Sequence, residues 1–198
     1  MDECAFNIGG RYGKTYVTRR PGEAYIESCI EPKFQRIETV MIWGCIMGGQ
    51  KGPLVIWDKK WGTITAQNYI SYVLRPQLVP YFQERREETQ NYVYFQQDGA
   101  PAHRARATTK YLQEEGVFPY IFPWPAGSPD ANPIEKLWNL MKQRISVRSP
   151  RPIKKDTLIA AIQEEWDRFS ALEIGELTAS LPARVRAIYD AGGGHTQY

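Results

Sequence analysis

Apolar residues gather in short runs, or alternate with polar residues, over several segments of the chain. Runs of this length that are rich in β-branched and aromatic residues and end at glycine or proline predict β-strands. The run TVMIWGCIM at residues 39–47 is apolar on both faces, which is typical of a central strand covered on both sides. The expected strands cover residues 4–8, 14–20, 39–47, 53–57, 91–97 and 117–122.

Other segments carry apolar residues at helical spacing. The first of them contains Pro76 and Pro80, which we expect to bend or interrupt the helix, and a charged loop over residues 84–90 is expected after it. Residues 123–133 are rich in proline and predict a long loop. The expected helices cover residues 65–83, 105–115, 134–145 and 156–169.

Early strands followed by alternating strands and helices predict an α/β fold, with a mixed sheet flanked by helices on both faces. The 198 residues are enough for a single domain, residues 1–198, with a substantial core. The longest apolar run, Val40 to Met47, is far too short to cross a bilayer, so we expect no membrane partner.

The three cysteines are widely spaced and form no CxxC pair, and the chain has only two histidines. We therefore expect reduced, mostly buried thiols in an intracellular protein, and no structural zinc site.

The net charge of +3 permits a polyanionic partner without requiring one. Basic residues gather in two clusters, which predict either phosphate contacts or ordinary solvated helix faces and linkers. The first cluster holds Arg104, Arg106 and Lys110, and the second holds Lys142, Arg144, Arg148, Arg151, Lys154 and Lys155.

Three acids stand out by their position in the predicted elements. Asp98 directly follows a predicted strand, Asp2 flanks the first strand, and Glu135 opens a helix behind the loop SPDANP. Carboxylates from distant segments that meet at a sheet edge are the ligands that Mg²⁺ or Mn²⁺ requires.

Each of these acids also has a purely structural interpretation. Asp98-Gly99 is a common turn dipeptide, and Asp2 adjoins a chain terminus. Asn132, Pro133 and Glu135 match the N-cap, N1 and N3 positions of a helix, so a capping box alone would explain this glutamate.

At these residues the chain resembles the catalytic domain of mariner-superfamily transposases, in the branch whose acidic triad is Asp, Asp, Glu. The similarity runs through the whole chain in order, and QQDGAPAH together with SPDANPIEKLW is highly specific. The matching segments are DECAFNIGG (2–10), RRPGEAY (19–25), VMIWGCI (40–46), GPLVIW (52–57), FQQDGAPAH (95–103), WPAGSPDANPIEKLWNLMK (124–142) and GGGHTQY (192–198).

The resemblance implies an RNase H-like fold and a site of two Mg²⁺ (or Mn²⁺) ions. Asp2 would bridge both ions, while Asp98 and Glu135 would each anchor one. His103 would orient a substrate phosphate or hydrogen-bond a ligand, or would simply start a helix, and Asp130 would shape its loop. The spacing from Asp98 to Glu135 is slightly longer than in the best-known members.

The resemblance also implies an activity, partners and a location. The expected activity is Mg²⁺-dependent phosphodiester hydrolysis and strand transfer at transposon ends, in the nucleus. The partners would be double-stranded DNA and a second protomer, reached through a loop at residues 13–37. The predicted DNA contacts are His103, Arg104, Arg106, Lys110, Lys142 and Arg148.

Members of this family carry most of a strand before the first aspartate, and a helix-turn-helix region before that. Here Asp2 follows Met1, so we expect a shortened first strand and no helix-turn-helix. This departure keeps a second hypothesis open, a catalytically inactive DNA-binding or protein-interaction module. An RNase H-type hydrolase of RNA–DNA hybrids is a third. Trp43, Trp124 and Trp138 are expected in the core rather than stacked on DNA.

Overall fold

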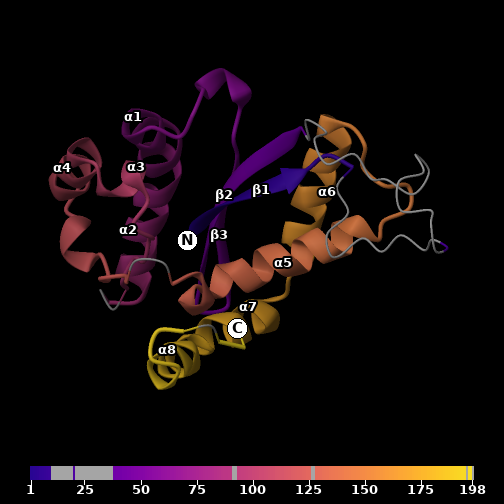
Figure 1. The fold of residues 1–198 in the computed structure, drawn as a ribbon. Helices are drawn as coiled ribbons and strands as arrows, with labels where there is room; N and C mark the ends of the chain where they lie inside the picture. The colour runs from indigo at the N-terminus through magenta and orange to yellow at the C-terminus, as the bar shows by residue number, and fades with distance from the viewer. Residues whose placement is uncertain (10–19, 21–37, 91–92, 126–127, 195, 198) are drawn as a thin grey trace.

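The computed structural model describes residues 1–9, 20, 38–90, 93–125, 128–194 and 196–197 (Figure 1). Its sheet consists of three antiparallel strands in the order β1-β2-β3. The predicted strands at residues 4–8, 39–47 and 53–57 are confirmed. The strands are Asp2–Asn7 (β1), Thr39–Met47 (β2) and Gln50–Ile56 (β3).

Helices make up most of the rest of the described chain. The predicted helices over residues 105–115, 134–145 and 156–169 are confirmed to within two residues. The helices are Ala66–Tyr69 (α1), Val79–Glu88 (α2), Pro101–Arg104 (α3), Arg106–Glu114 (α4), Pro133–Ser146 (α5), Lys155–Arg168 (α6), Ala171–Ala179 (α7) and Leu181–Asp190 (α8). A π-helical segment covers Ile70–Leu78, and 3₁₀ turns cover Lys59–Trp61, Phe118–Tyr120 and Pro129–Ala131.

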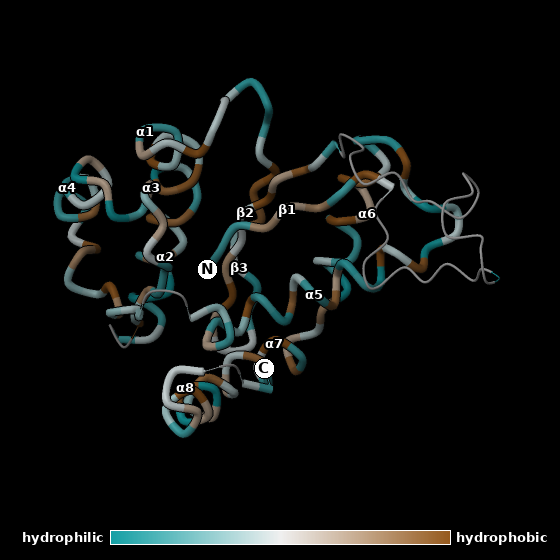
Figure 2. The backbone as a smooth tube through the Cα atoms, in the orientation of Figure 1, coloured by the Kyte–Doolittle hydropathy of each residue, from teal (hydrophilic) through white to brown (hydrophobic). Residues whose placement is uncertain are grey.

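The central strand β2 separates two hydrophobic cores. Trp43 and Cys45 face one core, which is shared with α1, the π-helical segment and α2. Val40 and Ile42 face the other, which is shared with α5, α6 and α7. The two groups of helices therefore flank the sheet on both sides, as the apolar pattern of β2 predicts (Figure 1), and Figure 2 shows hydrophobic residues along the strands between them.

A glycine in β2 lets α5 approach the sheet closely. A Cβ atom on Gly44 would lie 2.8 Å from the ring of Trp138 on α5 and 3.3 Å from Trp166 on α6. These two indoles stack with centroids 5.6 Å apart. The glycine thus fixes the height of α5 above β1 and β2, and with it the position of the first turn of α5.

The helix that begins at Ala66 is interrupted near its prolines but does not end there. A π-helical segment that contains Pro76 replaces the α-helical pairing, since i→i+5 pairing changes which carbonyl oxygen accepts. The helix then continues to Glu88, so the predicted charged loop over residues 84–90 is wrong. An ion pair between Arg85 and Glu88, 2.6 Å apart, supports the last turn.

The two later predicted strands are also corrected. Phe95 forms a single parallel bridge with Ile121, and residues 118–120 form a 3₁₀ turn rather than a strand. Pro119 lies inside that turn, where a ladder donor would be needed in a strand. Except for Arg20, the predicted strand at residues 14–20 and the predicted inter-protomer loop at residues 13–37 lie outside the described residues.

Cys4 and Cys45 are buried free thiols, as expected, while Cys29 lies outside the described residues. Burial raises the pKa of Cys4 to about 11 and that of Cys45 to about 12, so both stay protonated at neutral pH. Among the described residues, the helices are too short or too polar to cross a membrane.

Candidate active site

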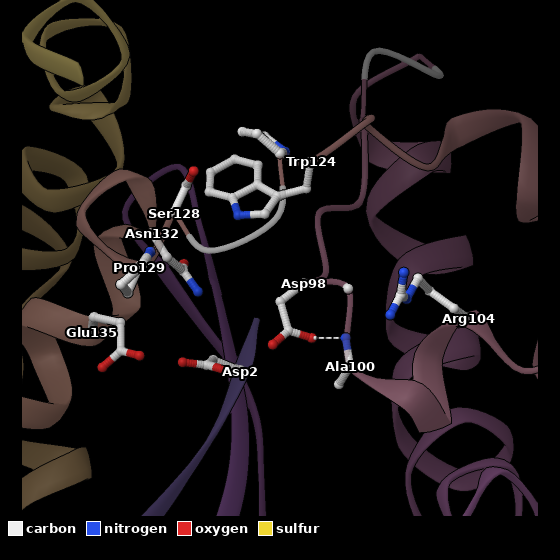
Figure 3. A pocket seen from close by; sticks show the side chains of 11 residues that line it. Asp2, Asp98, Ala100, Arg104, Trp124, Ser128, Pro129, Asn132 and Glu135 are labelled. Carbon is white, nitrogen blue, oxygen red and sulfur yellow. Dashed lines mark hydrogen bonds between the residues drawn. The ribbon is translucent and has the colours of Figure 1, made fainter. Parts of the chain in front are cut away.

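The three predicted acids line one cavity of about 320 Å³ (Figure 3). Asp2 begins β1, Asp98 follows the bridge at Phe95, and Glu135 lies in the first turn of α5. The sheet, a loop and a helix therefore bring together side chains that lie far apart in the sequence. The wall of the cavity also includes Arg104, Trp124 and Ser128.

Asp2 and Glu135 point toward each other across one side of this cavity (Figure 3). Burial, followed by the charge of Glu135 and a hydrogen bond with it, raises the pKa of Asp2 to about 8. Two carboxyl groups held this close cannot both carry a full negative charge at low cost. The pair therefore holds a proton in the protein alone, and a cation between the two groups would relieve the same repulsion.

The capping-box interpretation of Glu135 is wrong in this structure. Asn132 occupies the N-cap position and Pro133 follows it, but the Asn132 side chain makes no capping hydrogen bond. Its amide nitrogen instead donates to the carbonyl oxygen of Met1, 3.5 Å away. Glu135 is thus not used to close the helix end, and its carboxyl group is directed to Asp2.

Asp98 forms the opposite wall and is held by local contacts. Its Oδ1 accepts a hydrogen bond from the backbone N–H of Ala100 at 2.9 Å and lies 2.7 Å from Nδ1 of His103. No backbone turn forms at Asp98-Gly99, and these side-chain contacts aim the carboxylate at α3. The side chain keeps 46% of its surface exposed to the cavity.

His103 is buried between two carboxylates. Its Nδ1 faces Asp98 and its Nε2 lies 3.1 Å from Oε1 of Glu3, while the ring of Tyr69 packs 4.5 Å away. Burial alone would lower the pKa of His103, but the hydrogen bonds and charges of Glu3 and Asp98 outweigh it and raise the pKa. His103 is only 3% exposed, so it contacts Asp98, a predicted metal ligand, rather than DNA.

The cavity gathers the triad without closing it into a tight cluster. Within the ranges that the structure describes, no three His, Cys, Asp or Glu side chains are close enough together to hold a metal ion. Asp98 is turned toward Ala100, whereas Asp2 and Glu135 face each other (Figure 3). The predicted convergence thus consists of one close pair and a third acid across the same cavity.

The basic clusters differ in their surroundings. Arg104 lines the cavity, and Arg106 and Lys110 on α4 are exposed. Arg148 is instead bound to Glu164 at 2.7 Å and to the buried Glu165, which identifies a structural role for it.

Lys142 and Arg144 of the second cluster lie against the protein. The Lys142 ammonium sits 5.6 Å from the ring centroid of Phe6, and Arg144 pairs with Glu173 at 3.0 Å. Lys142, Arg144 and Arg148 thus lie against the protein, and the first cluster remains the better candidate for phosphate contacts.

Trp43 and Trp138 lie in the core as expected, but Trp124 does not, since it is half-buried at the cavity wall. Trp124, Pro125, Ser128 and Pro129 of this proline-rich segment line the cavity. The loop-shaping role of Asp130 is supported: its Oδ2 accepts from the backbone N–H of Thr196 at 3.1 Å and from that residue's hydroxyl at 3.0 Å.

Known proteins resemble this chain over its whole length. The family profile described as DDE superfamily endonuclease matches residues 1–159. The Transposable element Tc1 transposase of Caenorhabditis elegans is 29% identical over 203 residues, and the Tcb2 transposase of Caenorhabditis briggsae is 27% identical over 204. In both cases the match covers 100% of this chain and 68% of the relative.

Two solved structures share the fold. The Mos1 mariner paired end complex with Mn gives a TM-score of 0.75 at 20% identity, over 99% of this chain and 55% of that one. The catalytic domain of Mos1 mariner transposase gives 0.68 at 20% identity, over 81% and 77%. This chain therefore spans about half the length of the Mos1 chain in the complex and most of its catalytic domain.

Proposed function

Because the chain belongs to the DDE superfamily of endonucleases, as a transposase catalytic domain of the Tc1/mariner type, we propose that it cuts and joins DNA with bound divalent cations. The reaction begins with hydrolysis of a phosphodiester at a transposon end. The 3′-hydroxyl released there then attacks a target phosphodiester. Both steps break one P–O bond and form another.

One observation carries this proposal. Carboxyl groups from the first strand and from a late helix lie against each other in a cavity that a third acid also lines. Burial and the charge of Glu135 raise the pKa of Asp2, so ionising both acids of this pair is costly. Such perturbed pairs of acids are characteristic of functional sites.

The donors fit hard divalent cations, since all three acids offer only oxygen. Asp2 and Glu135 on one side of the cavity and Asp98 on the other would hold two Mg²⁺ or Mn²⁺ ions. Bound there, the ions would activate the attacking oxygen and stabilise the charge on the leaving oxygen. With cations bound, the Asp2–Glu135 pair would be fully ionised, and Asp98 is held in its orientation by Ala100 and His103.

Double-stranded DNA is the proposed substrate. Arg104 at the cavity wall supplies positive charge beside the acids, and Arg106 and Lys110 on α4 add exposed positive charge farther along the chain. Contacts of this kind to phosphates are independent of sequence and weaken as salt displaces them.

Substitution of Asp98 by Asn tests the proposal. Asp98→Asn is expected to abolish Mn²⁺-dependent cleavage of duplex DNA, because an amide is a poor cation ligand, while the circular dichroism spectrum stays unchanged. Asp190→Asn, an exposed residue at the end of α8, is the matched control and should retain full activity. Full activity of Asp98→Asn would remove this residue from the mechanism.

The same assay separates the remaining alternatives. A nuclease of the RNase H type would cleave an RNA–DNA hybrid in preference to duplex DNA, and we expect the reverse. An inactive binding module would retain DNA without cleaving it at any Mn²⁺ concentration.

A further inference from the structure

Glu3 is an acid next to Asp2 that the proposed chemistry does not use. It follows Asp2 on β1, and neighbouring residues of a strand point to opposite faces. Its side chain is only 17% exposed, and its Oε1 lies 3.1 Å from Nε2 of His103. A carboxylate at this depth needs a partner, and the imidazole is the one in contact with it.

The imidazole links Glu3 to Asp98. Its other nitrogen, Nδ1, lies 2.7 Å from Oδ1 of Asp98, and its side chain is 2% exposed. The ring therefore contacts one carboxyl group through each of its two nitrogens, and both nitrogens of an imidazole can take part in hydrogen bonds. Tyr69 packs on the ring with centroids 4.5 Å apart, which leaves the imidazole little room to turn.

The local fold supports the same arrangement from the other side. The Ala100 N–H binds the same Oδ1 of Asp98, and the backbone N–H of His103 donates to the Ala100 carbonyl oxygen at 3.0 Å. The carboxylate, the turn and the ring thus form one hydrogen-bonded unit, and Glu3 anchors it to the sheet.

We infer that Glu3 is a positioning residue, which fixes the orientation of the Asp98 carboxylate through the ring of His103 and so prepares Asp98 to bind a divalent cation. The inference rests on the proposed function for the cation itself. Partners of this kind that orient a ligand typically contribute about 10- to 100-fold to metal affinity. Asp98 keeps 46% of its side chain exposed, so without the anchored ring its orientation would depend on the Ala100 N–H.

Two substitutions of Glu3 separate positioning from mere packing. Glu3→Met keeps the length of the side chain but removes the acceptor, and Glu3→Gln keeps an acceptor oxygen. Glu114→Gln, at an exposed position on α4, is the control for loss of one negative charge. Each protein is compared with the wild-type full chain.

The first measurement uses the metal-free protein. Nitrogen-15 spectra of the imidazoles report which ring nitrogens carry a hydrogen-bonded proton, and His103→Asn assigns the signal because the chain has only two histidines. Wild-type His103 is expected to show bonded protons at both nitrogens. Glu3→Met should lose the one at Nε2, whereas Glu3→Gln should keep it.

The second measurement is calorimetric titration with Mn²⁺. We expect Glu3→Met to weaken Mn²⁺ affinity about tenfold, with Glu3→Gln restoring most of it and Glu114→Gln equal to wild type. An affinity of Glu3→Met within twofold of wild type would overturn the inference, while loss of binding in Asp98→Asn would still support the proposed function. A wild-type protein that binds no Mn²⁺ overturns both.

Should Glu3→Met unfold, the wild-type spectrum still decides. A His103 Nε2 without a hydrogen-bonded proton would overturn the link to Glu3.

Discussion

The two walls of the cavity are built in different ways. Asp98 is held by residues within five positions of it, through the Ala100 N–H and the His103 ring. Asp2 and Glu135 meet only because α5 packs on β1 and β2. One wall is thus a local motif and the other a product of tertiary packing, so the two should respond differently to substitution.

The largest expected effect on activity comes from substitution of Glu135, in the wall that is formed by tertiary packing. Glu135→Gln is expected to reduce Mn²⁺-dependent DNA cleavage by about a thousandfold or more, the order seen when one member of a catalytic unit is lost. Initial rates of duplex cleavage at saturating Mn²⁺ measure this. Glu176→Gln on α7 serves as control, and equal rates for Glu135→Gln and the control would place Glu135 outside the site.

The stability of the protein should depend on pH through the Asp2–Glu135 pair of the same wall. The pKa of Asp2 is about 8 in the folded protein, against an ordinary value of 3.8, because of burial first and Glu135 second. The folded state therefore binds a proton that the unfolded state releases, and the free energy of unfolding falls as pH rises from about 4 to 8.

Asp2→Asn removes this titration, so its unfolding free energy should depend less on pH over the same window. Urea unfolding of the metal-free proteins at several pH values compares the two. If the unfolding free energies of the two proteins changed equally with pH, Glu135 would not raise the pKa of Asp2.

A smaller effect, on stability, is expected from the glycines that lie near the two walls. Gly44→Ala places a Cβ 2.8 Å from Trp138 and is expected to cost about 1–3 kcal/mol of unfolding free energy. Gly99→Ala on the local wall meets nothing closer than 3.6 Å, at Arg104, and should change stability by less than about 0.5 kcal/mol. Denaturant titrations of both variants test this, and equal costs would contradict the difference between the walls.

The smallest effect is expected from the basic residues. Arg104→Ala should weaken binding to duplex DNA severalfold and reduce its salt dependence by about one ion, since one phosphate contact is lost. Arg148→Ala should leave DNA affinity unchanged and lower stability, because Arg148 pairs with the buried Glu165. Fluorescence anisotropy at several salt concentrations measures the affinities, and the reverse pattern would reassign the two clusters.

Local sequence patterns predicted most of the elements that position the site. The apolar run of β2 and the apolar stripe of α5 could be predicted from the sequence, because each element buries one continuous apolar surface. The charged end of α2 was missed because ion pairs such as Arg85–Glu88 support a helix without an apolar stripe. Phe118–Tyr120 reads as a strand by composition, but Pro119 makes a turn there.

Within the site, the three acids could be named from their motifs, but their partners could not. Glu3 contacts His103, which lies 100 positions away in the sequence. The only sequence signal is strand alternation, which indicates that Glu3 and Asp2 point to opposite faces of β1. Trp124 was placed in the core because its neighbours are apolar, although it lines the cavity. Tertiary contacts of this kind leave no periodic signal in a single sequence.

Diffraction from crystals soaked in Mn²⁺, recorded at a wavelength where manganese scatters anomalously, tests the central claim most directly. Two anomalous peaks are expected in the cavity, bounded by Asp2, Asp98 and Glu135, with Asp2 between them. Absence of manganese from these carboxylates at saturating concentration, or peaks that leave Asp98 without a bound ion, would contradict it.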